Sequence, residues 1–158
     1  MKLYQLKVKQ LLPMSLDKAW SFFSDPRNLS RLTPQWLNLK ITSDLPDEMY
    51  EGMIISYKVH PILGIPINWV TEITSVVKKK YFIDEQRFGP YKFWHHQHLF
   101  KEIDGGIEME DIVSYALPFD PLSRPLNKPL VGKKVKKIFE FREEVLKKLF
   151  TNRLEKTN

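Results

Sequence analysis

Cysteine is absent from this chain of 158 residues. Its absence excludes disulfide frameworks, thiolate nucleophiles and zinc or iron–sulfur sites that cysteine ligates. Long hydrophobic runs are missing as well, and the N-terminal segment MKLYQLKVKQLL alternates apolar and charged residues, unlike a signal peptide. We therefore expect a cytoplasmic protein with no integral membrane association.

Glycine is scarce, with only 6 residues, and the motifs that depend on it are missing. The chain has no GxGxxG motif for a dinucleotide and no GxSxG nucleophile elbow for serine hydrolysis. The GKK at residues 132–134 lacks both the earlier glycine and the following Ser/Thr of a phosphate-binding loop. We predict that the protein uses no cofactor.

The composition that is present suits one globular domain, which we expect to span residues 1–158. Hydrophobic residues make up 42% of the chain and aromatic residues 13%, enough for a sizeable core. The net charge of +6 is local, because residues 124–158 hold 11 Lys/Arg and 4 Asp/Glu. No aromatic residues interleave with these lysines, so we favour a solvated helix face over an anionic-lipid or nucleic-acid surface, and we predict no nucleic-acid partner.

Periodicity and breaks along the chain predict the order of elements. Residues 2–12 alternate as a strand, a short helix follows the N-cap Ser15, and a second short helix lies between Asp25 and Pro34. Period-two segments then predict six antiparallel strands, at residues 39–42, 52–60, 67–77, 81–88, 92–103 and 106–117. In residues 128–156 a helical stripe predicts one long amphipathic helix, formed by Val131, Val135, Ile138, Phe139, Val145, Leu146 and Leu149.

This order predicts an α+β fold. A curved seven-stranded antiparallel sheet would wrap around the long C-terminal helix, with two short helices between strands 1 and 2. The opening PMSLDKAWSFFSDPRNLSRLTP, and the strands MYEGMIISYKV, WVTEIT, FIDEQRFGPYKFWHHQHLF and MEDIVSYALPFDPL, resemble the START-like or SRPBCC superfamily of polyketide cyclase/dehydrase-like and lipid-transfer proteins. They are most similar to its bacterial ligand-binding branch. The resemblance implies a helix-grip fold and a cavity, and it carries over no uniform reaction.

Strand alternation assigns one set of side chains to the concave face of the sheet. In residues 81–88 we place the face of Phe82, Asp84, Gln86 and Phe88 inward, which leaves Glu85 and Arg87 in water. Such a mixture of polar and aromatic groups argues against a dry core, since buried polar groups need partners. The predicted ligand-binding residues are Tyr57, Trp69, Thr71, Asp84, Gln86, Trp94, His96, His98 and Asp111.

Several roles remain open for these residues. Asp84 with His96, or His98 with Asp111, could join neighbouring strands or contact a ligand. A histidine oriented by a carboxylate could also act as a general base in a cyclase, dehydratase or isomerase. His96 and His98 could ligate a metal with one aspartate, but no fourth ligand is suggested, and we predict no metal site.

We predict that the cavity binds a hydrophobic or aromatic small molecule, lipid-like or polyketide-like, between the sheet and the C-terminal helix. Catalysis by a histidine–aspartate pair in the same cavity is the alternative. The proline-rich residues 118–131 connect the last strand to the helix, either as a rigid connector, which we favour, or as a mobile gate.

Overall fold

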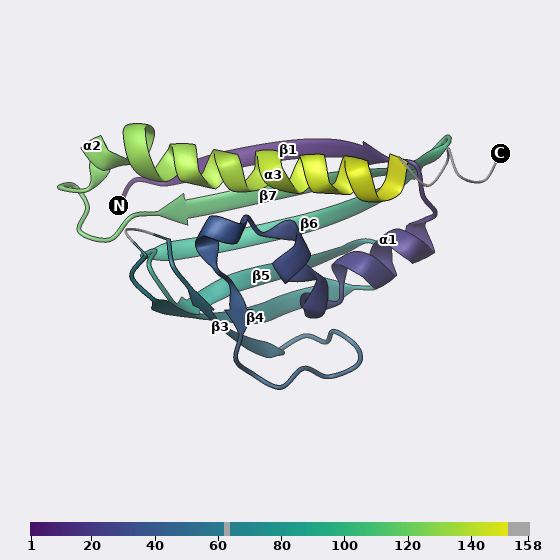
Figure 1. Ribbon diagram of the computed structural model, residues 1–158, viewed down its shortest axis with the longest axis horizontal. Coiled ribbons are helices and arrows are strands. Elements are labelled where there is room, and N and C mark those ends of the chain that lie inside the picture. The colour runs from purple at the N-terminus through teal and green to yellow at the C-terminus, as the bar shows by residue number, and fades with distance from the viewer. Residues whose placement is uncertain (62–63, 152–158) are drawn as a thin grey trace.

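The computed structural model describes residues 1–61 and 64–151. Seven strands form one antiparallel sheet in the order β1-β7-β6-β5-β4-β3-β2, which confirms the predicted meander (Figure 1). Most strands agree with their predicted bounds to within two residues; the strand expected at 39–42 is shorter. The strands are β1 (Tyr4–Leu12), β2 (Lys40–Ile41), β3 (Ile54–Val59), β4 (Ile67–Val77), β5 (Tyr81–Phe88), β6 (Phe93–Ile103) and β7 (Gly106–Ala116).

Short helices separate β1 from β2, and their ends follow the predicted caps. The Ser15 side chain accepts a hydrogen bond from the backbone N–H of Lys18 at the start of α1 (Leu16–Phe23). Asp25 caps the 3₁₀ helix η1 (Pro26–Leu32) in the same way, and Pro34 precedes the single turn η2 (Gln35–Leu37). These helices cover part of the concave face of the sheet (Figure 1).

The long C-terminal helix α3 (Gly132–Thr151) lies along β1 and β7 and covers the other part of that face (Figure 1). It starts four residues later than predicted, after α2 (Arg124–Leu126) and the π-helical turn η3 (Asn127–Val131). Pro129 lies within this turn. Because proline has no N–H to donate and its ring would clash with the preceding turn of an α-helix, the backbone here adopts the larger radius of a π-helix. The predicted helical residues 152–156 lie outside the described part of the chain.

The concave face is filled at one end by a hydrophobic cluster that we call the closed end. There Trp20 of α1 packs edge-on against Phe82 and Phe100, with ring centroids 6.1 and 5.7 Å apart. Leu146 of α3 completes the contact and is fully buried. The buried members of the closed end are Leu12, Met14, Ala19, Trp20, Phe23, Leu32, Phe82, Phe100, Ile107, Met109 and Leu146.

One inward assignment is wrong. Phe88 is 62% exposed, although the alternation along β5 placed it beside Gln86 on the concave face. The pairing of β4 with β5 shifts register between Val70 and Thr71, so Phe88 lies opposite Val70 while Gln86 lies opposite Thr71. A register shift of this kind changes the face on which a side chain emerges.

Candidate functional site

Beyond the closed end, the space between the sheet and α3 is hollow. A cavity of about 400 Å³ lies there, with η1 and η2 on one side and α3 on the other, and apolar side chains form most of its wall. Among the residues that line it are seven of the nine predicted site residues, Tyr57, Trp69, Thr71, Asp84, Trp94, His96 and His98.

The other two predicted residues do not line the cavity. The side chain of Gln86 is held by the β5–β6 turn: its amide nitrogen donates to the Tyr91 carbonyl at 2.6 Å, and its amide oxygen accepts from the Tyr91 N–H at 3.2 Å. Asp111 points inward from β7 but is covered by His96, His98 and Arg142. Gln86 thus shapes the turn, while Asp111 belongs to a buried polar cluster.

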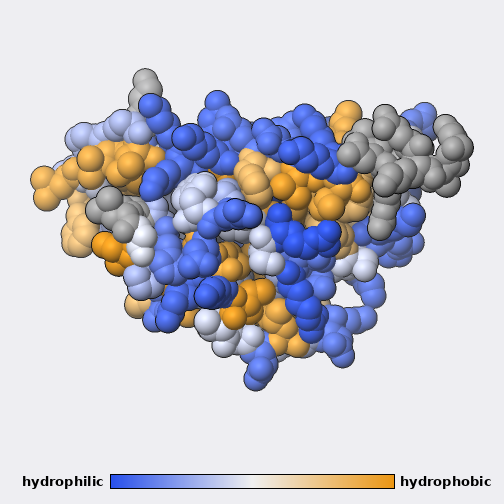
Figure 2. Space-filling view, viewed as in Figure 1, coloured by the Kyte–Doolittle hydropathy of each residue, from blue (hydrophilic) through white to orange (hydrophobic). Residues whose placement is uncertain are grey.

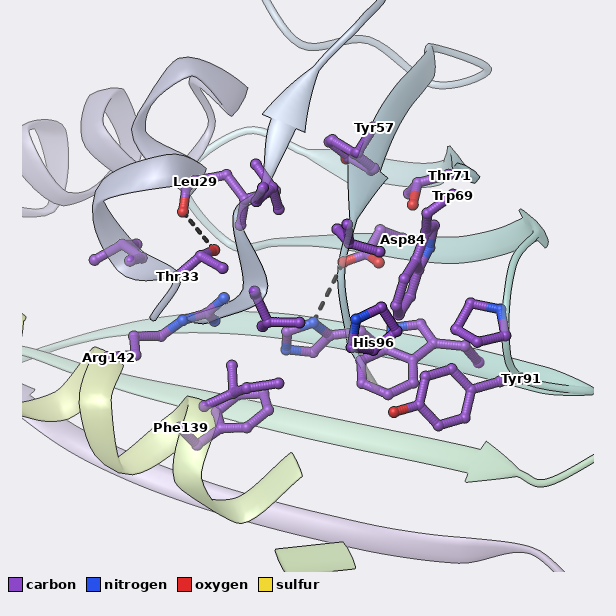
Figure 3. Close-up of a pocket in the computed structure, with 18 of the residues that line it drawn as sticks. Leu29, Thr33, Tyr57, Trp69, Thr71, Asp84, Tyr91, His96, Phe139 and Arg142 are labelled. Atoms are coloured by element: carbon purple, nitrogen blue, oxygen red, sulfur yellow. Dashed lines mark hydrogen bonds and ion pairs between the residues drawn. The ribbon is translucent and has the colours of Figure 1, made fainter. Parts of the chain in front are cut away.

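Aromatic rings form the wall at the other end of the cavity. Trp69 of β4 meets Trp94 of β6 edge-on with centroids 5.4 Å apart, and Tyr91 lies 4.8 Å from Trp94. Phe139 of α3 faces them across the cavity, 5.6 Å from the ring of His96 (Figure 3). Tyr91 and Phe139 were not among the predicted site residues, since one lies in a turn and the other was assigned only to the helix core.

Four side chains from three neighbouring strands form the polar cluster. His96 Nε2 lies 2.8 Å from Asp111 Oδ1, and His98 Nε2 lies 2.9 Å from Asp84 Oδ2. The remaining ring nitrogens also face carboxylates, at 3.4 Å from His96 Nδ1 to Asp84 and 2.9 Å from His98 Nδ1 to Asp111. The two imidazole rings lie 3.8 Å apart, so each histidine lies between both carboxylates.

Arg142 of α3 completes the cluster, and the sequence analysis missed it. Its Nη1 lies 3.3 Å from Asp111 Oδ1, and the side chain is buried against the ring of Phe139 (Figure 3). Residue 142 lies three positions after Phe139 and four before Leu146, on the apolar stripe of the helix. An arginine among the apolar residues of a helix face needs a buried anionic partner. Its position in the sequence could therefore have indicated that a carboxylate faces Arg142.

Solved structures with the same fold are known, although sequence comparison finds no relative. No protein-family model and no curated protein matches the chain. Similar solved structures include TTHA0849 of Thermus thermophilus, with a TM-score of 0.65 at 14% identity over 90% of this chain and 97% of that one. Major latex-like protein 151 of Panax ginseng gives a TM-score of 0.67 at 10% identity, over 94% of this chain and 97% of that one.

The di-domain ARO/CYC StfQ from the steffimycin biosynthetic pathway gives a TM-score of 0.68 at 8% identity, over 97% of this chain and 52% of that one. The chain shares the helix-grip fold of these structures. This confirms the fold that the sequence resemblance implied. At these identities the likeness describes the backbone arrangement alone, so the chemistry of this cavity has to be read from its own residues.

The charges in the cluster compensate one another. Burial would raise the pKa of the Asp111 carboxyl, but Arg142 and the two histidines hold it well below its ordinary value. Burial opposes ionisation of Asp84 too, and His96 and His98 nevertheless lower its pKa.

The two histidines are shifted in opposite directions. Burial and the neighbouring His98 lower the pKa of His96, whereas the two carboxylates raise the pKa of His98 against the effect of burial. These directions favour protonation of His98 over His96, and with His98 protonated the cluster would carry two positive charges against two carboxylates.

This arrangement limits the chemistry available in the cavity. Each imidazole makes one hydrogen bond to a carboxylate, through Nε2, so carboxylates orient both rings. The Nδ1 atoms make no hydrogen bond in the described residues, although that of His96 lies 3.4 Å from Asp84 and the buried one of His98 lies 2.9 Å from Asp111. Asp84, His96 and His98 each offer a possible metal-ligand atom within 4.8 Å of one another. The guanidinium of Arg142 already supplies a positive charge to this cluster, which opposes the entry of a cation.

Proposed function

We propose that the protein binds a hydrophobic or aromatic small molecule, lipid-like or polyketide-like, in the cavity between the sheet and α3. The observation that carries the proposal is an apolar cavity of about 400 Å³ whose few polar groups gather at one place. Sites for small molecules have this character and this range of volume. The SRPBCC fold supports the proposal, because its long helix and curved sheet enclose such a space.

The polar cluster favours a ligand with a neutral acceptor group. Its charges already balance, so a ligand carboxylate would bring an uncompensated charge into an apolar cavity. Arg142 borders the cavity. A carbonyl, ester or hydroxyl oxygen of the ligand could accept a hydrogen bond from its guanidinium without adding charge.

Catalysis as a cyclase, dehydratase or isomerase is supported less well. A general base needs a nitrogen within hydrogen-bond reach of the substrate proton; here both Nε2 atoms are bonded to carboxylates, His98 Nδ1 is buried, and His96 Nδ1 faces Asp84 at 3.4 Å. The likeness to StfQ concerns the backbone only. Binding therefore explains the cavity with fewer assumptions than turnover does.

The test compares one neutral and one anionic probe of similar size, N-phenyl-1-naphthylamine and 1-anilinonaphthalene-8-sulfonate, by fluorescence titration. We expect the neutral probe to bind more tightly. Substituting Ile138→Trp, on the cavity wall of α3, should fill the space and weaken binding at least about tenfold. The matched control is Ile112→Trp on the half-exposed outer face of β7, which should leave binding unchanged.

Native mass spectrometry of the protein purified without added ligand complements this titration. A small apolar molecule retained at stoichiometric level would support the proposal and identify the ligand class. Equal effects of Ile138→Trp and Ile112→Trp, or probe binding weakened by neither, would show that the probes bind outside the cavity and would contradict it.

A further inference from the structure

The open end of the cavity is bordered by exposed hydrophobic side chains. Phe119 and Leu122 are 82% and 84% exposed, and Leu126 and Leu130 are 54% and 39% exposed. All four belong to the connector between β7 and α3, and three of them, Phe119, Leu126 and Leu130, also line the cavity. We call these four residues the apolar rim. Clusters of this kind on a protein surface mark an interaction site more often than isolated exposed side chains do.

The rim includes an unusual backbone conformation and is faced by a tryptophan. Phe119 has φ of 57°, in the left-handed region that a bulky residue rarely adopts. Across the opening, Trp36 is 44% exposed, and the Nζ atom of Lys134 lies 5.5 Å from the centre of its ring. Tryptophan is well suited to an interface between apolar and aqueous surroundings.

Positive charge adjoins the apolar rim. Residues 117–137 contain six Lys/Arg and one acidic residue, Asp120, which pairs with Arg124 and the N-terminal amine. A surface hollow beside the rim is lined by Lys2, Arg124, Lys133 and Lys136. In Figure 2 hydrophobic side chains gather at the left end, where Figure 1 places α2, and hydrophilic side chains follow the adjoining length of α3.

We propose that the apolar rim and the adjoining lysines dock the protein peripherally on an anionic phospholipid bilayer, with the cavity opening toward the membrane. Exposed apolar side chains next to a basic surface are what binding to such an interface requires, since the first enter the acyl boundary and the second attract the headgroups. This proposal departs from our preference for a solvated helix face. No helix in the described residues is long and apolar enough to cross a membrane.

A bilayer fits this surface better than a nucleic acid does. Nucleic-acid surfaces combine lysines with aromatic rings for stacking or polar groups for base edges. The rim instead offers three leucines and one phenylalanine at a cavity opening. The inference goes beyond the proposed ligand binding, since docking needs no ligand in the cavity, but it would let an apolar ligand pass between bilayer and cavity without crossing water.

The experiment is co-sedimentation of the whole chain with vesicles of phosphatidylcholine alone or mixed with phosphatidylglycerol. We expect binding to the mixed vesicles, weakened when added salt shortens the Debye length to about 3 Å. The double substitution Phe119→Ala with Leu122→Ala should weaken binding at least about tenfold. The matched control, Leu11→Ala with Ile54→Ala, removes two side chains that are 65% and 48% exposed away from the rim and should have no effect.

Charge reversal separates the basic surface from the apolar rim. Lys133→Glu with Lys136→Glu should weaken binding to the mixed vesicles by about fivefold or more per lysine. Lys78→Glu with Lys101→Glu, at exposed positions near the opposite end of the sheet, changes the net charge equally and should have little effect.

Two outcomes would overturn the proposal. One is failure of the unsubstituted protein to sediment with mixed vesicles at low salt. The other is equal loss of binding in the rim variants and their controls, which would leave only non-specific attraction by net charge. Binding to an oligonucleotide but not to vesicles would assign the surface to nucleic acid instead. Urea unfolding of the same variants shows whether they remain folded, and because it does not depend on a ligand it keeps this test separate from that of ligand binding.

Discussion

The two ends of the concave face use the same strands in different ways. At the closed end α1 reaches the sheet, and Trp20, Phe82 and Phe100 fill the space between the layers. At the open end Trp69 and Trp94 line a wall of the cavity instead of filling it. The polar cluster lies where the two ends meet, with Phe82 stacked 4.1 Å from His98.

This difference teaches that an inward-facing residue is not always a packed one. Alternation along β5 and β6 continues through both ends, so the strands alone do not distinguish a core from a cavity wall. The covering layer makes the distinction: Leu146 of α3 contacts the closed end, whereas one turn earlier Arg142 turns toward the sheet carboxylates. The predictions below test that contrast.

The largest effect should come from truncation at the closed end. Phe100→Ala removes a buried ring from a close-packed cluster and should lower the free energy of unfolding by about 4 kcal/mol. Trp94→Ala, on the half-buried wall of the cavity, should cost clearly less because one side of the ring already lacks partners. Urea unfolding of both variants measures the difference. Equal losses would show that the open end is packed as tightly as the closed end.

Removing Arg142, which contacts the polar cluster from α3, should lower the free energy of unfolding somewhat less than Phe100→Ala does. Arg142→Met removes the cation that faces the buried carboxylate of Asp111, and we expect a loss of about 3 kcal/mol in the free energy of unfolding. Adding Asp111→Asn should recover part of it, since the unpaired negative charge is removed. Additive losses in the double variant would contradict coupling between the two side chains.

A surface ion pair provides the control for Arg142. Arg87→Met breaks the exposed pair with Glu72 and removes the same guanidinium from the outer face of β5. Exposed pairs contribute at most about 1 kcal/mol, so this variant should remain close to the original stability. A loss as large as that of Arg142→Met would mean that burial of the cluster is unimportant.

Much of the fold followed from alternation and turn chemistry, and much of the site did not. Period two in β6 and β7 placed His96, His98 and Asp111 inward because each residue on a strand faces opposite to its neighbour. The inward prediction for Phe88 was wrong because a register shift between two strands cannot be recognised from the sequence of one strand. Arg142 was missed because charge was counted along α3 without asking which charges interrupt its apolar stripe.

The geometry of the cluster depended on contacts that alternation does not specify. Both histidine–aspartate pairs considered from the sequence lie directly opposite one another, Asp84 with His96 and His98 with Asp111. The hydrogen bonds instead run diagonally, from His96 to Asp111 and from His98 to Asp84. The order of the strands brings the four residues together, but the side-chain rotamers determine which histidine bonds to which aspartate.

Stability should also depend on pH, and the slope should originate in His98. The carboxylates of Asp111 and Asp84 raise its pKa in the folded protein despite burial, so above pH 6.5 the folded state keeps a proton that the unfolded state has lost. The free energy of unfolding should therefore fall as pH rises from 6.5 through the folded pKa, by at most about 1.4 kcal/mol per pH unit for one proton. His98→Gln should flatten this slope, while His95→Gln on the outer face should keep it. A slope that survives His98→Gln would show that the polar cluster does not hold its positive charge on this histidine, and that the balance of charge between the two ends has to be assigned anew.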